Sequence, residues 1–371
     1  MVETATRSVD SDTLEALSIG AGILGTGGGG NPFLGKITTQ RLLGGEGSVP
    51  IVAVEDLSED AVVIATGGMG SPTIGIERMG DGAESLRAVQ ALERYTGRAA
   101  THIAIGEIGG SNAIVPVRVA YQMGLPVVDA DAMGRAFPEH QMDTFTIYGI
   151  PPTPAALSDI RGHSVIFDEI GVANDLERYA RAVTIQMGGA AGYAFPVMSA
   201  DDMRRTAIPG TLSLAIRLGE AVLGARAAHR DPVAASLAVM GGQRLFTGKI
   251  TDVDRRLVGG FARGALRMDG ADADSGRRLH IAFQNENLVA RDEGGTVLCA
   301  VPDLICIVDT ETGEPITTEV LRYGLRATVL GIPAPAMLRT PLALTYIGPA
   351  AFGYPDVEYI PMIGTYGVAN A

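Results

Sequence analysis

The sequence predicts an α/β N-terminal domain with a mainly parallel sheet, followed by a smaller β-rich (α+β) C-terminal domain. The 371 residues suffice for two domains at roughly 150 residues each. In the first half, short apolar segments alternate with segments of helical periodicity, as in parallel βαβ units. After Arg255, apolar segments separated by turn residues indicate a largely antiparallel region. Prolines at 151, 152 and 154 interrupt the pattern, so we divide the chain into residues 1–165 and 166–371.

The elements of the first half follow from this alternation. A helix is predicted over residues 13–23, after a capping Asp12. Strands are predicted at residues 51–54, 61–65, 102–105 and 125–128, and helices at 84–94 and 112–123. Three of the strands run into glycine- or acid-rich loops at residues 67–72, 106–110 and 129–131. Because ligands bind beyond the carboxyl ends of parallel strands, we expect a site where these loops converge.

The second half begins with a long helix, predicted at residues 211–228 after Pro209 and Gly210. Strands are predicted at residues 280–290, 295–300, 304–309 and 326–330. Four polar residues, 284–287, interrupt the first of these strands. Buried polar groups need partners, so this run either faces a site or lies on a solvated edge.

The composition excludes several classes of function. There are 29 basic and 42 acidic residues, a net charge of -13, which argues against nucleic acids and anionic membranes as partners. The chain starts without the apolar segment of a signal peptide and has no apolar run of about 18 residues. Two cysteines alone suit a reducing compartment, so we expect a cytoplasmic protein. A homo-oligomer is expected on base rates only.

The glycine run near the N-terminus matches two nucleotide motifs incompletely. Residues 20–25 have the GxGxxG spacing, but a helical pattern precedes them where a strand is required. Residues 30–36 have the frame of a P-loop, but Ile37 replaces the Ser or Thr that would hold magnesium. Two interpretations remain for the loop from Thr26 to Asn31. Its N–H groups form an anion-binding nest, with Gly28 and Gly29 at its centre, or the loop is a close-packed turn.

Carboxylates follow two of the predicted strands. Glu107 lies in a glycine-rich turn before Asn112. Two roles are open for this carboxyl: it is a catalytic acid or base, or it caps nearby N–H groups. Asp129 and Asp131 suit a shared proton or a divalent metal, or they form ion pairs with Arg135.

The remaining candidates are the cysteines. Cys299 and Cys306 lie in apolar segments, where a cysteine is usually inert, although either is a candidate nucleophile. The five histidines form no HxH or HExxH motif, so a histidine-rich zinc site is not predicted.

Five segments together resemble one family: LGTGGGG at 24–30, GEIGGSN at 106–112, LPVVDADAMGRAFPE at 125–139, FQNE at 283–286 and PDLI at 302–305. It is the S-methyl thiohydantoin desulfurase family, formerly a domain of unknown function, whose members are often associated with hydantoinase/oxoprolinase proteins. The resemblance spans nearly the whole chain. It implies a hydrolase of ergothioneine catabolism that replaces the methylthio group of a propionate-bearing S-methyl thiohydantoin with oxygen, giving a hydantoin and methanethiol.

Two enzymatic mechanisms fit this chemistry. In the first, a carboxylate among Glu107, Asp129 and Asp131 activates water and another acts as general acid. In the second, Cys306 or Cys299 attacks the ring carbon. In both mechanisms the binding groups we expect are Arg135 or the loop of Thr26, Gly28, Gly29 and Asn31 for the propionate, and Asn112, Gln284 and Asn285 for the ring amides.

Cofactors and other functions complete the predictions. We expect no cofactor and assign no metal ligands, while a divalent metal on the two aspartates remains a third variant. The substrate is a small molecule. The alternative function is a non-catalytic subunit or regulator of a hydantoinase/oxoprolinase complex.

Overall fold

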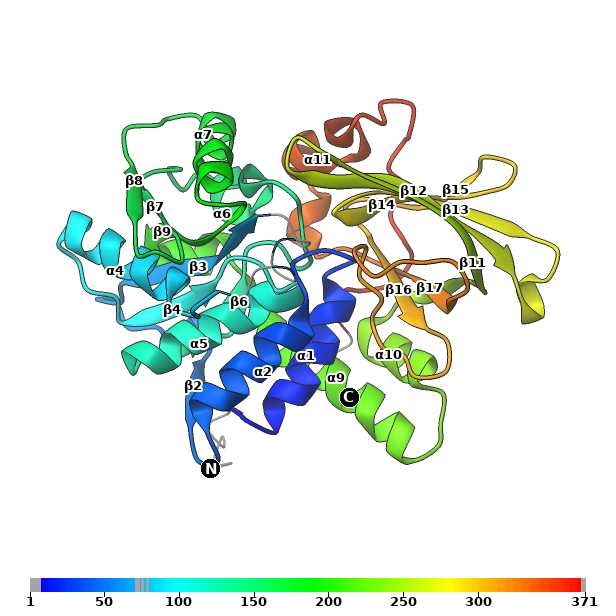
Figure 1. Ribbon diagram of the computed structural model, residues 1–371, viewed down its shortest axis with the longest axis horizontal. Helices are drawn as coiled ribbons and strands as arrows, with labels where there is room; N and C mark the ends of the chain where they lie inside the picture. Colours follow the sequence, from blue (N-terminus) through cyan, green and yellow to red (C-terminus); the bar gives the residue numbers. More distant parts are fainter. Residues whose placement is uncertain (1–7, 71–73, 75–76, 78–79, 368–371) are drawn as a thin grey trace.

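The computed structural model describes residues 8–70, 74, 77 and 80–367. Figure 1 shows helices and a sheet from the N-terminal part on one side of the molecule, and a curled antiparallel sheet on the other. The two-domain prediction, α/β followed by β-rich, is therefore confirmed. No helix in the described ranges is long and apolar enough to cross a membrane.

The N-terminal sheet has eight strands in the order β1-β2-β5-β4-β3-β9-β7-β8. Its strands are β1 (Ser8–Asp10), β2 (Ser48–Val52), β3 (Val63–Gly70), β4 (His102–Ile105), β5 (Val127–Val128), β7 (Ala155–Ser158), β8 (Ser164–Phe167) and β9 (Ala190–Met198). Strands β2, β5, β4 and β3 are parallel, and each of the others pairs antiparallel. The sheet is thus mixed, with a parallel centre as the βαβ pattern predicts.

The sheet does not follow the division of the sequence at residue 165. Strand β9 comes from the second part of the chain, yet it pairs with β3 and β7 in the first sheet. The prolines at 151, 152 and 154 lie directly before β7, and the division of the chain into residues 1–165 and 166–371 stays a prediction. Residues 67–70, predicted as a turn, continue β3, and residues 71–72 of the same prediction lie outside the described residues.

Helices lie around both sheets, with the last two in the chain on the side of the second sheet (Figure 1). They are α1 (Thr13–Leu24), α2 (Pro32–Leu43), α4 (Glu84–Thr96), α5 (Ile114–Met123), α6 (Thr144–Ile147), α7 (Ala173–Gln186), α8 (Ala200–Thr206), α9 (Thr211–Ala227), α10 (Pro232–Met240) and α11 (Pro341–Ile347). Asp12 precedes α1 but its side chain makes no cap hydrogen bond. Instead, Asp10 Oδ1 accepts from the Thr13 N–H at 2.8 Å, so the predicted cap is wrong by two residues.

Helices α1 and α9 pack at unusually close range. A Cβ atom added at Gly20 would lie 1.8 Å from the carbonyl oxygen of Ala215 on α9. The GxGxxG spacing therefore serves helix packing, because residues 20–24 lie inside α1 and Gly25 is its C-cap. Lys36 of the P-loop-like frame pairs with Glu15, with Nζ 2.6 Å from Oε2.

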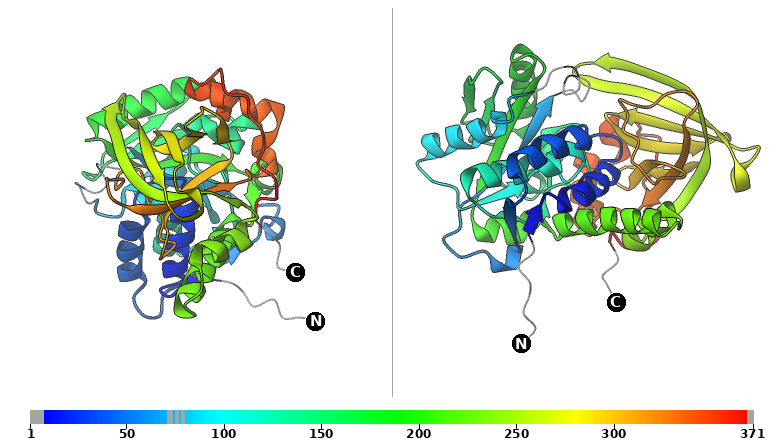
Figure 2. Two further views of the ribbon diagram at one scale, coloured as in Figure 1. Left: turned by 90° about the vertical axis from the view of Figure 1, so that its right-hand side faces the viewer. Right: turned by 60° about the horizontal axis from the view of Figure 1, so that its bottom comes forward.

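The C-terminal sheet is antiparallel throughout, in the order β15-β14-β13-β12-β11-β17-β16. Its strands are β11 (Gln243–Val258), β12 (Phe261–Gly270), β13 (Arg278–Gln284), β14 (Glu286–Asp292), β15 (Val297–Ala300), β16 (Leu304–Asp309) and β17 (Arg326–Ile332). Figure 2 shows how the long β11–β12 ribbon gives this sheet its curl. A two-stranded ladder of β6 (Ala130–Asp131) and β10 (Ile208–Pro209) completes the fold.

The strand predicted over residues 280–290 is two strands. The chain turns sharply at Asn285, which has φ of 55°, and β13 pairs with β14 on either side of it. Asparagine tolerates this left-handed conformation better than most residues. The polar run thus forms a hairpin turn, and Glu286 begins a new strand.

Candidate active site

A cavity of about 450 Å³ lies between the two domains, a size that suits a small molecule. Its walls come from the loops after β3 and β4, from α2 and α5, from the segment around Phe137, and from the β13–β14 turn. The residues that line it include Gly29, Asn31, Glu107, Asn112, Arg118, Phe137, His140, Tyr193, Asn285 and Glu286. The site therefore opens at the carboxyl edge of the parallel strands, where the sequence pattern places it.

Glu107 occupies the turn after β4 and is 8% exposed. Its carboxyl accepts hydrogen bonds from Asn112 Nδ2 and, at 3.0 Å, from the Phe137 N–H. Burial raises the pKa of Glu107 from 4.5 to about 7, against the two hydrogen bonds, which lower it. At neutral pH this carboxyl is therefore poised between its two protonation states.

Glu286 faces the same cavity from the other domain and is 2% exposed. Burial raises its pKa well above 4.5, the charge of Glu107 raises it further, and Arg135 opposes the shift. Oε2 of Glu286 is buried without a hydrogen-bond partner among the described residues. Glu286 is not among the residues predicted from the sequence, although an acidic residue within an apolar, strand-forming segment is a signal that could have identified it.

The glycine loop makes room for this second carboxyl. A Cβ atom at Gly28 would lie 1.8 Å from Oε1 of Glu286. The backbone N–H of Gly29 lowers the pKa of Glu286, as expected for a donor aimed at a carboxylate. Of the two interpretations of this loop, close packing therefore describes Gly28, and the carboxyl group that the loop faces is the protein's own.

Asn112 and Asn285 have different parts in the site. Oδ1 of Asn112 accepts from the Gly68 N–H at 2.8 Å, while Nδ2 donates to Glu107, so this side chain positions the carboxyl. Oδ1 of Asn285 accepts from the Ala262 N–H at 2.9 Å. Its amide nitrogen donates no hydrogen bond to a described residue, which leaves it available to a ligand in the cavity.

An aromatic group forms one end of the cavity. The His140 ring lies edge-on to Tyr193 and Phe195, at centroid distances of 4.7 Å and 4.5 Å, and the Tyr193 hydroxyl contacts its ring nitrogens. Burial lowers the pKa of His140 to about 3, so the imidazole is neutral. This end of the cavity suits an apolar substituent.

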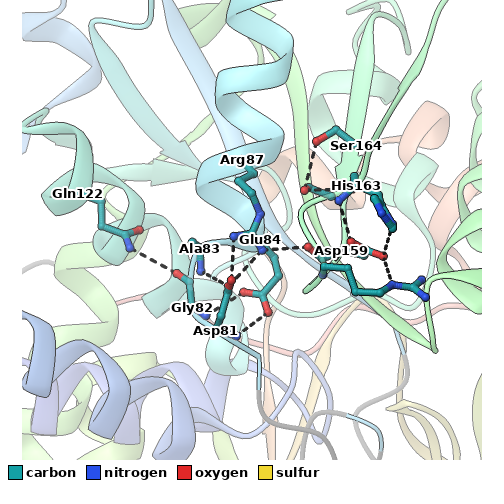
Figure 3. A network of polar contacts seen from close by, with 11 residues as sticks. Asp81, Gly82, Ala83, Glu84, Arg87, Gln122, Asp159, His163 and Ser164 are labelled. Atoms are coloured by element: carbon teal, nitrogen blue, oxygen red, sulfur yellow. Dashed lines mark hydrogen bonds and ion pairs between the residues drawn. The ribbon is translucent and has the colours of Figure 1, made fainter.

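The cavity rim is held by the polar network of Figure 3. Glu84 at the start of α4 accepts from the N–H groups of Asp81 and Gly82, each at 3.0 Å. Arg87 bonds Asp81 at 2.8 Å and the carbonyl oxygen of Asp159 at 2.9 Å. These bonds tie the rim to the β7–β8 hairpin.

Other predicted site residues lie outside the cavity lining. They are Thr26, Gly28, Asp129, Asp131, Arg135, Gln284, Cys299 and Cys306. Asp129 accepts from Ser213 N and Oγ, at 2.9 and 2.6 Å. Asp131 is fully buried, and Oδ2 accepts from the N–H groups of residues 108, 133 and 134, each at 2.9 Å. Burial raises its pKa to about 7, but its carboxyl serves the backbone.

These contacts argue against a divalent metal bound by Asp129 and Asp131. The oxygens of both aspartates already accept hydrogen bonds from the protein, so the pair offers no free donor set for a divalent ion. Among the described residues, no group of three or more His, Cys, Asp or Glu side chains is arranged to hold a metal.

Arg135 is fully buried and joins the domains. Its Nε donates to Ala136 O at 3.0 Å. Its Nη1 donates to the carbonyl oxygens of Pro302 at 3.0 Å and Asp303 at 2.9 Å. Its Nη2 donates to Thr26 Oγ1 at 2.8 Å and to Asn287 O at 3.1 Å. All the N–H groups of a guanidinium are thereby used. No donor remains for a propionate, and Arg135 forms no ion pair with the aspartates.

Neither cysteine is in a reactive setting. Burial raises the pKa of Cys306 to about 12, and that of Cys299 well above 9.0. Both thiols pack in apolar clusters away from the cavity.

Comparison with known proteins places the chain in a family. Residues 12–169 match the model of the S-Me-THD-like N-terminal domain, and residues 172–362 match that of the S-Me-THD-like C-terminal domain. The chain is 26% identical to a protein from Chromobacterium violaceum of known crystal structure, with a TM-score of 0.80 over 96% of this chain and 99% of that chain. No curated protein matches the sequence. Because the two models together match most of the chain, this protein belongs to the S-Me-THD-like family.

Proposed function

We propose that this protein is a hydrolase that replaces the methylthio group of an S-methyl thiohydantoin with oxygen. Family membership supports a thiohydantoin desulfurase-like function in general. The observation that carries the reaction type is the meeting of Glu107 and Glu286, one from each domain, in a single cavity. Two carboxyls whose environments set their pKa values apart can divide the roles of acid and base between them.

The electrostatics support a division of these roles. Burial, and then the charge of Glu107, raise the pKa of Glu286 and favour its protonated form, so Glu286 is the general acid of the proposed reaction. Glu107, with a pKa of about 7, supplies a carboxylate near neutrality and is the general base. A base with this pKa takes a proton from water more readily than an ordinary glutamate does.

The reaction balances with water alone. Glu107 takes a proton from water as the water oxygen bonds to ring carbon C2. Glu286 protonates the adjacent ring nitrogen, giving a tetrahedral intermediate. The C–S bond then breaks, the departing sulfur takes the proton that Glu107 holds, and methanethiol leaves. Loss of the hydroxyl proton returns Glu286 to its acid form and leaves the C2 carbonyl of the hydantoin.

The cavity walls suit this substrate. The free amide of Asn285 can donate to the ring carbonyl, and the aromatic end can take the methylthio group, because sulfur packs well against aromatic rings. Water activated by a carboxyl is favoured over a cysteine nucleophile, because neither thiol lines the cavity and burial raises the pKa of both.

The test is release of methanethiol. Purified protein is incubated with the propionate-bearing S-methyl thiohydantoin, and thiol is titrated over time against Glu107→Gln as the matched control. Steady release by the wild type, with none above background from the variant, supports the proposal. A wild-type rate equal to the uncatalysed rate would reject this substrate and favour the subunit function instead.

A further inference from the structure

A guanidinium in the cavity wall forms no ion pair with any residue that the structure describes. Arg118 of α5 lines the cavity and donates to Thr38 Oγ1 of α2 at 3.2 Å. Its Nε is buried without a hydrogen-bond partner among the described residues. No ion pair is formed by Arg118 within the described ranges, although the charges of Glu84 and Asp81 act on it from further away.

Other arginines near the cavity have an ion-pair partner or use all their donors on protein oxygens, although Nε of Arg87 is also buried without a hydrogen-bond partner. Arg181 bonds Glu177, with Nε 2.5 Å from Oε1, and Arg87 bonds Asp81 at 2.8 Å. Arg135 uses every N–H group on protein oxygens. Arg118 therefore stands out as a half-buried cation with no ion-pair partner among the described residues, and a negatively charged ligand would supply the missing charge.

Thr38 cannot supply that charge. Its hydroxyl is 3.0 Å from Leu34 O and 2.9 Å from Gly35 O, so it donates to the helix backbone and offers Arg118 only a neutral acceptor. Arg118 lines the cavity, and its guanidinium has a planar fork that matches a carboxylate.

We infer that Arg118 is the carboxylate-binding residue of this cavity, and that the substrate is a ring with an anionic arm. The inference rests on the proposed function only in placing the ring at Glu107 and Glu286. It replaces Arg135 and the glycine loop as the propionate site. Helices α2 and α5 then hold the arm, while the two carboxyls hold the reacting end.

The test separates arm recognition from catalysis. kcat/KM is measured for two S-methyl thiohydantoins, one with the propionate and one with its uncharged amide, using wild type, Arg118→Ala and Arg118→Lys. Arg41→Ala, at an exposed position on α2, is the matched control. The wild type should prefer the acid by about 10- to 100-fold, the scale of charge-assisted hydrogen bonds.

In Arg118→Ala this preference should fall toward one, with part of it restored in Arg118→Lys and all of it kept in Arg41→Ala. A preference that survives in Arg118→Ala, or a wild type that does not discriminate, would overturn the inference.

A binding measurement keeps the inference independent of turnover. Calorimetry compares hydantoin-5-propionate with its amide on the same proteins. Selective binding that Arg118→Ala abolishes supports the subsite even if no methanethiol is released, and in that case only the proposed reaction fails. Equal binding of both compounds to the wild type overturns the subsite whatever the activity.

Discussion

The raised pKa of Glu107 predicts a pH-dependent cost in stability that a Glu107→Gln change removes. The pKa rises from 4.5 to about 7, which at about 1.36 kcal/mol per unit is about 3 kcal/mol. Since the folded state binds the proton more tightly, the cost is absent below about pH 4.5 and complete above about pH 7. Wild-type stability should therefore fall relative to the variant as pH rises through this window.

Glutamine also disturbs one hydrogen bond, because its amide nitrogen cannot accept from Asn112 as the Oε2 atom of Glu107 does. That loss, about 1 kcal/mol, is the same at every pH. The quantity to follow is therefore the difference in free energy of unfolding between wild type and Glu107→Gln. This difference should change by about 3 kcal/mol between about pH 4.5 and about pH 8.

Urea unfolding at several pH values measures this difference. Glu220→Gln, at an exposed position of α9, controls for the loss of one carboxylate from an acidic protein. A difference between wild type and Glu107→Gln that stays constant with pH would refute the reasoning, since it would mean that Glu107 titrates as an ordinary glutamate.

Further predictions concern neighbouring residues. Cys306→Ser and Cys299→Ser should retain the wild-type rate of methanethiol release, because neither thiol reaches the cavity; a loss of about 10²-fold or more without unfolding would restore the covalent mechanism. Gly28→Ala should displace the Glu286 carboxyl and lower kcat with little loss of stability. Gly219→Ala should instead lower the free energy of unfolding by about 1–3 kcal/mol in urea, because its Cβ atom would lie 1.8 Å from Ala16 O. Asn112→Ala should move the acidic limb of the kcat/KM profile upward by about one pH unit, because it removes a hydrogen bond that lowers the pKa of Glu107; an unmoved limb would contradict the role of Asn112. Arg135→Met should cost about 3–5 kcal/mol of stability, and an unchanged urea midpoint would contradict the interdomain role of Arg135.

The parts of the fold that sequence predicts are those set by local pattern. The strand at residues 102–105 matches β4, and the helix at 211–228 ends within one residue of α9, because apolar periodicity and flanking turn residues define both. Strand β9 was not predicted. Its place between β3 and β7 depends on pairing with residues more than a hundred positions earlier, which no local pattern reveals.

The same limit applies to the site. Glu107 could be chosen because it follows a predicted strand in a glycine turn. Arg135 was predicted to bind the ligand. Its hydrogen-bond acceptors come from residues far away in sequence, including Thr26 and Asp303, so the sequence does not show that its donors are already used. Glu286 was missed because the turn at Asn285 reverses the chain inside an apolar segment, and only the folded hairpin brings that carboxyl to the cavity.

The most direct test of the two-carboxyl account is the rate of Glu286→Gln. Glutamine keeps the shape of the protonated side chain but supplies no acidic proton. The account predicts that kcat for methanethiol release falls by about 10²- to 10⁴-fold, the usual contribution of a general acid, with the urea unfolding midpoint unchanged. A variant that releases methanethiol within about twofold of the wild-type rate would contradict the assignment of Glu286 as the acid.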